Sequence, residues 1–157
     1  MQGFSMFRCV LVVAMTVMLL AVSNALAAPG GKSAPMGHVL CRVMPTAVGL
    51  VLDKRGNLYT ADRDTGCVYC LTPSSGTVLL ARVPGEPRVL AVDRLRTVYV
   101  GTGEGAVYAV SLAGEVGEVC RFGTGVVGMV VDRDGGLAVV LANGAVMRVD
   151  RERFRMQ

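Results

Sequence analysis

Residues 47–71 read AVGLVLDKRGNLYTADRDTGCVYCL, and the pattern of this stretch decides the fold. An apolar run ends at Asp53, a short polar turn follows, and a second run rich in β-forming residues begins near Tyr59. A turn that closes at Gly66 then leads into a third run. Apolar runs of about four to eight residues, separated by turns that contain Gly and Asp, predict β-strands joined by hairpins.

The same pattern recurs twice more along the chain. Residues 88–110 read RVLAVDRLRTVYVGTGEGAVYAV, and residues 126–149 read VVGMVVDRDGGLAVVLANGAVMRV. The aspartates that follow the first apolar runs, Asp53, Asp93 and Asp132, are 40 and 39 residues apart. An internal period of about 40 residues indicates a repeat architecture.

A fourth apolar run precedes each unit: VLCRV at residues 39–43, LLARV at 79–83 and EVCRF at 118–122. Four short antiparallel strands in a unit of about 40 residues are the signature of a β-propeller blade. The first run of each unit is apolar at both odd and even positions, whose side chains point to opposite faces of a strand. This indicates a strand that is covered on both faces. We therefore predict an all-β fold, a partial β-propeller of about three four-stranded antiparallel blades of roughly 40 residues each, over residues 39–157.

The turns after the repeat aspartates have their own chemistry. In DKRGN at residues 53–57 and DRDGG at 132–136, the Asp carboxylate can cap the backbone of the turn, and Gly can take a positive φ. The turn at 93–97 reads DRLRT and has no Gly. We expect this turn to be less tightly specified than the other two.

Two segments resemble known propeller repeats. Residues 49–73, GLVLDKRGNLYTADRDTGCVYCLTP, resemble an NHL-type repeat and the blades of gluconolactonase-like and strictosidine-synthase-like propellers. Residues 98–116, VYVGTGEGAVYAVSLAGEV, are similar in addition to the repeats of pyrroloquinoline-quinone propellers, although the Trp of those repeats is absent from this chain. The resemblance implies the architecture and leaves the activity open.

The likeness to gluconolactonase-like enzymes implies an alternative function. Those enzymes hold a divalent metal in the central channel with carboxylate and Asn ligands, and a metal-dependent lactonase-like hydrolase would here be assembled from two chains or be a truncated relative. The nearest counterparts of the ligands are Glu86, Asn143 and Asp64, although the spacing from Glu86 to the following aspartate departs from the family's pattern. An oxygen-rich ligand set of this kind suits calcium or magnesium.

Residues 1–27 read as a signal peptide. Arg8 is followed by the apolar run CVLVVAMTVMLLAV and by ALA at residues 25–27, a small-x-small cleavage pattern. An apolar run of about 14 residues is shorter than the roughly 20 that a membrane-spanning helix needs. We expect cleavage before Ala28, a flexible linker over residues 28–38, and a periplasmic or secreted protein with no stable membrane span.

Composition excludes several classes of function. The net charge is +4, and the basic residues are spread singly with few aromatic residues between them, unlike the clustered basic face of a nucleic-acid-binding protein. His38 is the only histidine, so the sequence supports neither a Ser-His-Asp triad nor a histidine metal site. The GTGEG run at residues 101–105 precedes a predicted strand, whereas a phosphate-binding loop of this kind precedes a helix.

The cysteines are predicted to be structural. In a strand, Cys67 and Cys70 would have Cα atoms about 10 Å apart, beyond the usual disulfide limit of about 6.8 Å. Cys41 and Cys120 occupy equivalent positions two units apart, so they should not meet within one ring. The pairing of these four cysteines, or of one of them with another chain, stays open.

The sequence therefore predicts an exported propeller module that binds a protein or ligand, with no catalytic residues and no cofactor. Closed propellers usually have about four to eight blades, so we expect a protein partner or a second copy of the chain to complete the ring. The candidate ligand-binding residues lie in loops between strands and blades: Arg63, Asp64, Glu86, Arg88, Glu104 and Asn143.

Overall fold

The computed structural model describes residues 43–150 and residue 152. The chain divides into two compact units, residues 1–40 and 41–157, and every described residue belongs to the second. The described residues contain no helix with the length and hydropathy that crossing a membrane requires. Several predictions lie outside the described residues: the signal peptide, the linker, His38, Cys41 and most of the run at 39–43.

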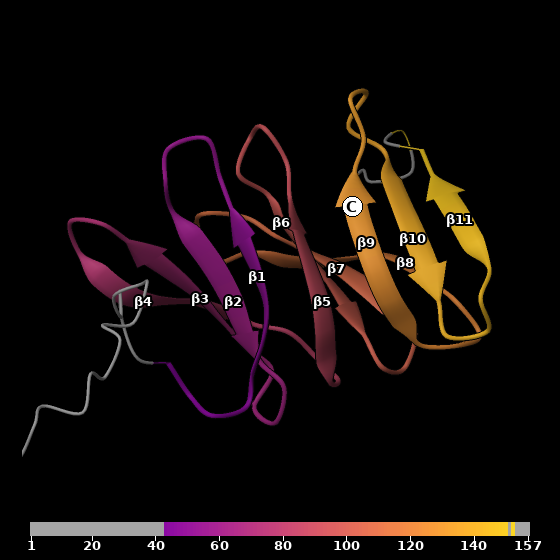
Figure 1. Ribbon diagram of the computed structural model, residues 1–157, viewed down its shortest axis with the longest axis horizontal. Coiled ribbons are helices and arrows are strands. Elements are labelled where there is room, and N and C mark those ends of the chain that lie inside the picture. The colour runs from indigo at the N-terminus through magenta and orange to yellow at the C-terminus, as the bar shows by residue number, and fades with distance from the viewer. Residues whose placement is uncertain (1–42, 151, 153–157) are drawn as a thin grey trace, which may run out of the picture. The chain divides into compact units, whose positions relative to one another are not determined.

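The described residues form eleven strands in three antiparallel sheets, which are the blades of the propeller (Figure 1). Blade 1 consists of β1 (Ala47–Leu52), β2 (Leu58–Asp62), β3 (Cys67–Thr72) and β4 (Gly76–Arg82). Blade 2 consists of β5 (Pro87–Val92), β6 (Val98–Thr102), β7 (Ala106–Val110) and β8 (Val116–Arg121). Blade 3 consists of β9 (Val126–Val131), β10 (Leu137–Leu141) and β11 (Val146–Val149).

The predicted all-β fold, a partial β-propeller, is confirmed. The apolar runs at 47–52 and 126–131 coincide with β1 and β9. The runs at 79–83 and 118–122 each provide the fourth strand of the blade before the unit that they precede. Thus β4 pairs with β3, β8 pairs with β7, and blade 3 has three strands in the described part of the chain.

The hydrophobic core lies between the blades. Between blades 1 and 2, the side chains of Tyr59 and Val68 pack with Val100 and Tyr108. Between blades 2 and 3, a second cluster combines residues of both sheets: Ala91, Tyr99, Val107, Val126, Leu137 and Val139 among them. Since blade 2 is covered on both faces, every residue of β6 and β7 is buried.

The innermost strands are irregular. A register shift interrupts the pairing of β1 with β2 between Val48 and Val51, and similar shifts occur in β5 and β9. Shifts of this kind are β-bulges, which place an extra residue on one strand and bend it. The extra residues of β5 and β9, Arg88 and Val127, are exposed.

The repeat aspartates cap their turns as expected. Asp53 Oδ1 accepts hydrogen bonds from the backbone N–H groups of Arg55 and Asn57, at 2.8 and 2.9 Å. Asp93 and Asp132 make the same pair of bonds to their own turns. The turn at 93–97 is therefore as closely tied as the others, contrary to the expectation from its lack of Gly, and Arg96 adopts a φ of 68° to close it.

Candidate functional site

The connections between strands gather at two opposite ends of the blades. One end carries the turns at residues 53–57, 93–97 and 132–136, each of which joins the first two strands of a blade, and we call it the Asp-turn end. The opposite end, which we call the loop end, carries the β2–β3, β6–β7 and β10–β11 turns and the connections between blades. All six predicted site residues lie at the loop end or next to it.

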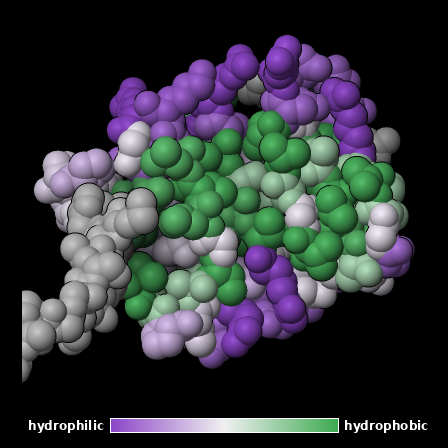
Figure 2. Space-filling model, viewed as in Figure 1, coloured by the Kyte–Doolittle hydropathy of each residue, from purple (hydrophilic) through white to green (hydrophobic). Residues whose placement is uncertain are grey.

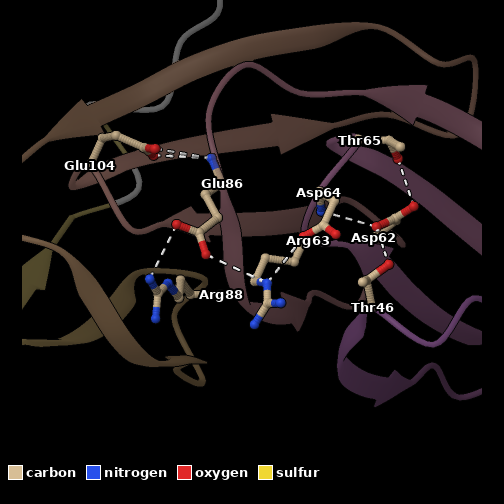
Figure 3. A network of polar contacts seen from close by, with 8 residues as sticks. All are labelled: Thr46, Asp62, Arg63, Asp64, Thr65, Glu86, Arg88 and Glu104. Atoms are coloured by element: carbon tan, nitrogen blue, oxygen red, sulfur yellow. Dashed lines mark hydrogen bonds and ion pairs between the residues drawn. The ribbon is translucent and has the colours of Figure 1, made fainter.

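The structure brings five of these six residues together in one polar network (Figure 3). Arg63 Nε lies 3.3 Å from Asp64 Oδ1 and 3.6 Å from Glu86 Oε1. The guanidinium of Arg88 contacts Glu86 Oε2 at 3.1 Å. The carboxylate of Glu104 accepts hydrogen bonds from the backbone N–H of Glu86, at 3.2 and 3.1 Å. These five residues form what we call the loop-end cluster.

Asn143 stays apart from this cluster. Its Oδ1 accepts a hydrogen bond from the backbone N–H of Ala145 at 3.0 Å, within the β10–β11 turn. No contact among the described residues joins it to the other five. The three nearest counterparts of the metal ligands, Glu86, Asn143 and Asp64, are thus not assembled into one site. More generally, among residues 43–150 and 152 no three His, Cys, Asp or Glu side chains are grouped so that they could hold a metal ion.

Asp62 holds the turn that carries Arg63 and Asp64. Its buried carboxylate accepts hydrogen bonds from Thr46 Oγ1 at 2.7 Å, Thr65 Oγ1 at 2.8 Å and the backbone N–H of Asp64 at 3.0 Å (Figure 3). The bond from Thr46, followed by that from Thr65, lowers the pKa of Asp62 below its ordinary value. The turn is therefore fixed in place by an ionised aspartate.

Charge within the loop-end cluster is largely neutralised. Arg63 comes from blade 1, whereas Glu86 and Arg88 come from the start of blade 2, so the Arg63–Glu86 ion pair joins one blade to the next. Hydrogen bonds from the backbone N–H of Glu86 lower the pKa of Glu104. Each cation already faces a carboxylate, and exposed ion pairs of this kind contribute little to stability. The ligand-binding role of these residues stays a prediction.

A pocket of about 270 Å³ lies at the Asp-turn end and is built from all three blades. Each repeat supplies the same three consecutive positions: an apolar residue, the repeat aspartate and a basic residue. At this end, hydrophilic side chains border the hydrophobic surface that lies over the inner strands (Figure 2). The lining residues are Leu52, Asp53, Lys54, Val92, Asp93, Arg94, Val131, Asp132 and Arg133. We call this the Asp-turn pocket.

The carboxylates of the Asp-turn pocket are directed into their own blades. Besides its turn bonds, Asp53 accepts hydrogen bonds through Oδ2 from Asn57 Nδ2 at 2.8 Å and from the buried Tyr59 hydroxyl at 3.0 Å. Burial by itself would raise the pKa of Asp53, but the hydrogen bonds from Asn57 and the others outweigh burial and lower it. The carboxylate of Asp132 faces the guanidinium of Arg148 at 2.9 Å.

The cations of the Asp-turn pocket are differently placed. Lys54, Arg94 and Arg133 are exposed, and none makes a hydrogen bond or an ion pair with another residue that the structure describes. Three repeat-equivalent cations therefore line the same pocket as Leu52, Val92 and Val131. This site was not predicted from the sequence, although each repeat aspartate is followed directly by a basic residue.

The three described cysteines form no disulfide bond with one another. Cys67 and Cys70 both lie in β3, and Cys120 lies in β8. Burial raises the pKa of the Cys70 thiol, and burial together with the charge of Glu118 raises that of Cys120 to about 11. A raised pKa keeps these thiols protonated and poorly nucleophilic at neutral pH.

Comparison with known proteins supports the fold. No family model matches the sequence, and no curated protein matches it. Virginiamycin B lyase from Staphylococcus aureus, in a catalytically inactive form with quinupristin, is similar at 12% identity and a TM-score of 0.51, over 66% of this chain and 41% of that one. A streptogramin B lyase structure is similar at 16% identity and a TM-score of 0.52, over 67% of this chain and 40% of that one.

A third similar structure is the calcium-binding protein regucalcin from Agrobacterium tumefaciens. It has 14% identity and a TM-score of 0.50, over 60% of this chain and 37% of that one. The chain thus spans about two fifths of the length of the solved structures that it matches. At these identities the likeness shows the β-propeller fold alone.

Proposed function

We propose that the chain is an exported β-propeller module that binds a ligand through the Asp-turn pocket, and that the ligand combines an anionic group with an apolar body. The observation that carries this proposal is that three repeat-equivalent cations without an ion pair among the described residues, Lys54, Arg94 and Arg133, line one pocket together with an apolar residue from each repeat. The likeness of residues 49–73 to NHL-type and gluconolactonase-like blades supports the assignment of the repeat to that class of propeller.

The chemistry of the pocket favours an amphipathic anion. Its three aspartates accept backbone hydrogen bonds within their own turns, whereas the cations are free to meet a ligand. Small-molecule sites are lined mostly by apolar side chains with a few polar groups that fix orientation, and they begin at about 300 Å³. A pocket of about 270 Å³ therefore suits a small ligand such as a medium-chain carboxylate.

The loop end offers less to an anion. Its hollow of about 390 Å³ is lined by the turn at residues 64–65 and the segment at 82–85, so it draws on blade 1 and the connection that follows it. The neighbouring cations Arg63 and Arg88 already contact Glu86. A ligand there would have to displace existing ion pairs, which the Asp-turn pocket does not require.

Calorimetric titration of the full chain with octanoate tests the proposal, because octanoate has a carboxylate on an apolar chain. Octanol and octylammonium serve as the neutral and cationic comparisons and should bind more weakly. Replacing Lys54, Arg94 and Arg133 together by Gln should weaken octanoate binding at least tenfold, since each charged contact at a solvated rim contributes about 0.5 kcal/mol or more.

A matched variant removes the same number of cations from the loop end: Arg63→Gln, Arg82→Gln and Arg88→Gln. This control should bind octanoate like the unmodified chain. If the control loses binding and the pocket variant keeps it, the site lies at the loop end instead. If octanoate binds no better than octanol, the anionic class of ligand is wrong.

Export is the second part of the proposal. Arg8, the apolar run that follows it and the ALA pattern at residues 25–27 support cleavage before Ala28 and a periplasmic or secreted location. The intact mass of the protein recovered from an exporting host should match a chain that starts at Ala28. Recovery of the uncleaved chain in the membrane fraction would contradict this part alone.

A further inference from the structure

The hollow at the loop end of blade 1 carries two opposite charges. Its volume is about 390 Å³, and we call it the loop-end hollow. The negative charge comes from the β2–β3 turn, and the positive charge comes from the last residue of β4. The chain that leads from β4 to β5 supplies the rest of the wall. The lining residues are Asp64, Thr65, Arg82, Val83, Pro84 and Gly85.

Arg82 has no partner for its charge in the described part of the chain. It is exposed and makes no hydrogen bond or ion pair with another residue that the structure describes. Arg121 holds the same place in blade 2, because Arg82 pairs with the first residue of β3 and Arg121 with the first residue of β7. The guanidinium of Arg121 contacts both carboxylate oxygens of Glu118, at 3.0 and 2.6 Å. Two equivalent arginines therefore differ in whether they are neutralised.

The difference arises three residues earlier in each outer strand. Residues at this spacing in a regular strand point to opposite faces. The register shift that β4 and β8 share adds one residue between them, which turns them to the same face. In β8 this brings Glu118 onto the arginine, whereas the corresponding residue of β4 is Leu79, since both pair with the tyrosine of the third strand. Leucine accepts no hydrogen bond, so Arg82 keeps its N–H donors for a carboxylate from outside the described chain.

Asp64 supplies a carboxylate that can accept further hydrogen bonds. Its side chain is 60% exposed, and its Oδ1 lies 3.3 Å from Arg63 Nε (Figure 3). Its Oδ2 makes no hydrogen bond or ion pair with another residue that the structure describes. The turn is held by Asp62, which bonds the backbone N–H of Asp64 and leaves the side chain free of that task. An exposed ion pair such as that with Arg63 contributes little to stability, so Asp64 can meet a cation without loss to the fold.

From these contacts we propose that the loop-end hollow binds a zwitterion, a free α-amino acid. The guanidinium of Arg82 receives its carboxylate, in the bidentate geometry that arginine favours. Asp64 receives its ammonium group, whose N–H donors a carboxylate oxygen accepts. The volume of about 390 Å³ falls within the range of roughly 300 to 1,000 Å³ that small-molecule sites have. Val83 and Pro84 favour an amino acid with an apolar side chain.

The two charges of the loop-end hollow select against ligands with a single charge. An anion that meets Arg82 also lies near the carboxylate of Asp64, and a cation that meets Asp64 also lies near the guanidinium. Like charges at short range repel, so a ligand with one charge forfeits part of its attraction. The inference therefore concerns a different site and a different class of ligand from the Asp-turn pocket, and it does not depend on the function proposed for that pocket.

Calorimetric titration with L-norleucine tests this proposal. Hexanoate and hexylammonium are the comparisons, because each has an apolar chain of similar length and one of the two charges. The titrations use the full chain with Lys54, Arg94 and Arg133 replaced by Gln, so that hexanoate does not bind in the Asp-turn pocket. Norleucine should bind at least tenfold more tightly than either comparison. Absence of norleucine binding, or equal binding of hexanoate, would overturn the proposal.

Substitution of the two equivalent arginines locates the site. Arg82→Gln should weaken norleucine binding at least tenfold, because it removes the charge that meets the carboxylate. Arg121→Gln is the matched control and should leave binding unchanged, since Glu118 already occupies that guanidinium. Equal losses in the two variants would place the amino acid elsewhere and overturn the assignment to the loop-end hollow.

A change at Leu79 tests the reason why Arg82 is available. Leu79→Glu gives blade 1 the carboxylate that blade 2 has, so it should engage Arg82 and weaken norleucine binding at least fivefold. Leu79→Gln has the same length without the charge and should bind like the unmodified chain. Equal binding by both variants would contradict the proposal. Octanoate titration of Leu79→Glu, made without the pocket substitutions, should match that of the unmodified chain, which separates failure of the loop-end hollow from failure of the Asp-turn pocket.

Discussion

Blade 2 and blade 3 are built from the same repeat, yet equivalent positions in them have opposite environments. Val107 in β7 is fully buried, whereas Val146 in β11 is 70% exposed. The sequences around these residues, AVYAV and AVMRV, both begin with Ala-Val, and the main difference is Arg148 in place of Ala109. Burial in this fold therefore depends on the neighbouring blade and not on the repeat alone.

This difference has an energetic consequence. Apolar surface contributes to folding only when it leaves water, at roughly 25 cal/mol for each Å². Blade 2 gains this contribution on both faces, whereas blade 3 gains it on the face toward blade 2. The same substitution should therefore have unequal effects in the two blades.

The largest effect is expected from an aspartate in place of each of the two equivalent valines. Val107→Asp buries an unpaired charge between blades 2 and 3, and it should lower the free energy of unfolding by more than about 4 kcal/mol. Val146→Asp should change it by less than about 1 kcal/mol. Urea unfolding, followed by circular dichroism at a protein concentration where the chain is monomeric, measures both. Equal losses would show that blade 3 is as well covered as blade 2.

A smaller effect is expected at the repeat aspartates, and it should depend on pH. Asp53 is buried and accepts two side-chain hydrogen bonds, whereas Asp132 in blade 3 is half-buried and faces Arg148. Hydrogen bonds to a charged group contribute about 1.5 to 3 kcal/mol each, so Asp53→Asn should destabilise the protein by about 2 kcal/mol at pH 7. Asp132→Asn should lower the free energy of unfolding by less, because the ion pair of Asp132 with the exposed Arg148 contributes little to stability.

The pH dependence follows from the lowered pKa of Asp53. A carboxyl group whose pKa is lower in the folded than in the unfolded protein stabilises the fold above its unfolded value of about 4, and this contribution is lost as pH falls through the folded value. The difference between the unmodified protein and Asp53→Asn should therefore shrink below about pH 4. Thermal unfolding between pH 7 and pH 3 measures this, and a difference that stays constant over the range would argue against an ionised Asp53.

The smallest effect is expected from the turn residue that differs between the two blades. Arg96 has a φ of 68° where blade 3 has Gly135 at 85°. Because a side chain in the left-handed region costs about 1 kcal/mol, Arg96→Gly should stabilise the protein by up to that amount. Gly135→Arg should destabilise it by a similar amount. Midpoints of urea unfolding provide the measurement, and a loss of stability in Arg96→Gly would show that the Arg96 side chain makes a compensating contact.

Much of the fold could be predicted from the sequence because its signals are local. Continuous apolar runs gave the bounds of β1 and β9, and the aspartate in each repeat identified the capped turns. The blades to which β4 and β8 belong could not be predicted. A repeating sequence does not show at which strand each blade begins, and strand pairing depends on residues that are distant in the sequence. The turn at Arg96 was misjudged because its two backbone hydrogen bonds to Asp93 compensate for the missing glycine.

The candidate site was harder to predict than the fold. The grouping of Arg63, Glu86 and Arg88 fits the expectation that their loops share one end of the blades, but the sequence did not reveal that these charges neutralise one another. The Asp-turn pocket was missed because Lys54, Arg94 and Arg133 are about 40 residues apart and look like isolated surface charges. Only the superposition of the repeats places them together.

The bulges described above also bear on how the protein avoids aggregation. Free strand edges recruit strands from other molecules, and bulges and charged residues interrupt that pairing. Every four-stranded blade has a register shift next to its outermost strand, and each innermost strand is itself shifted. The pairing of β10 with β11 is regular throughout. Among the described strands, β11 thus offers the one uninterrupted template, so unintended polymerisation in concentrated solution should begin at this edge.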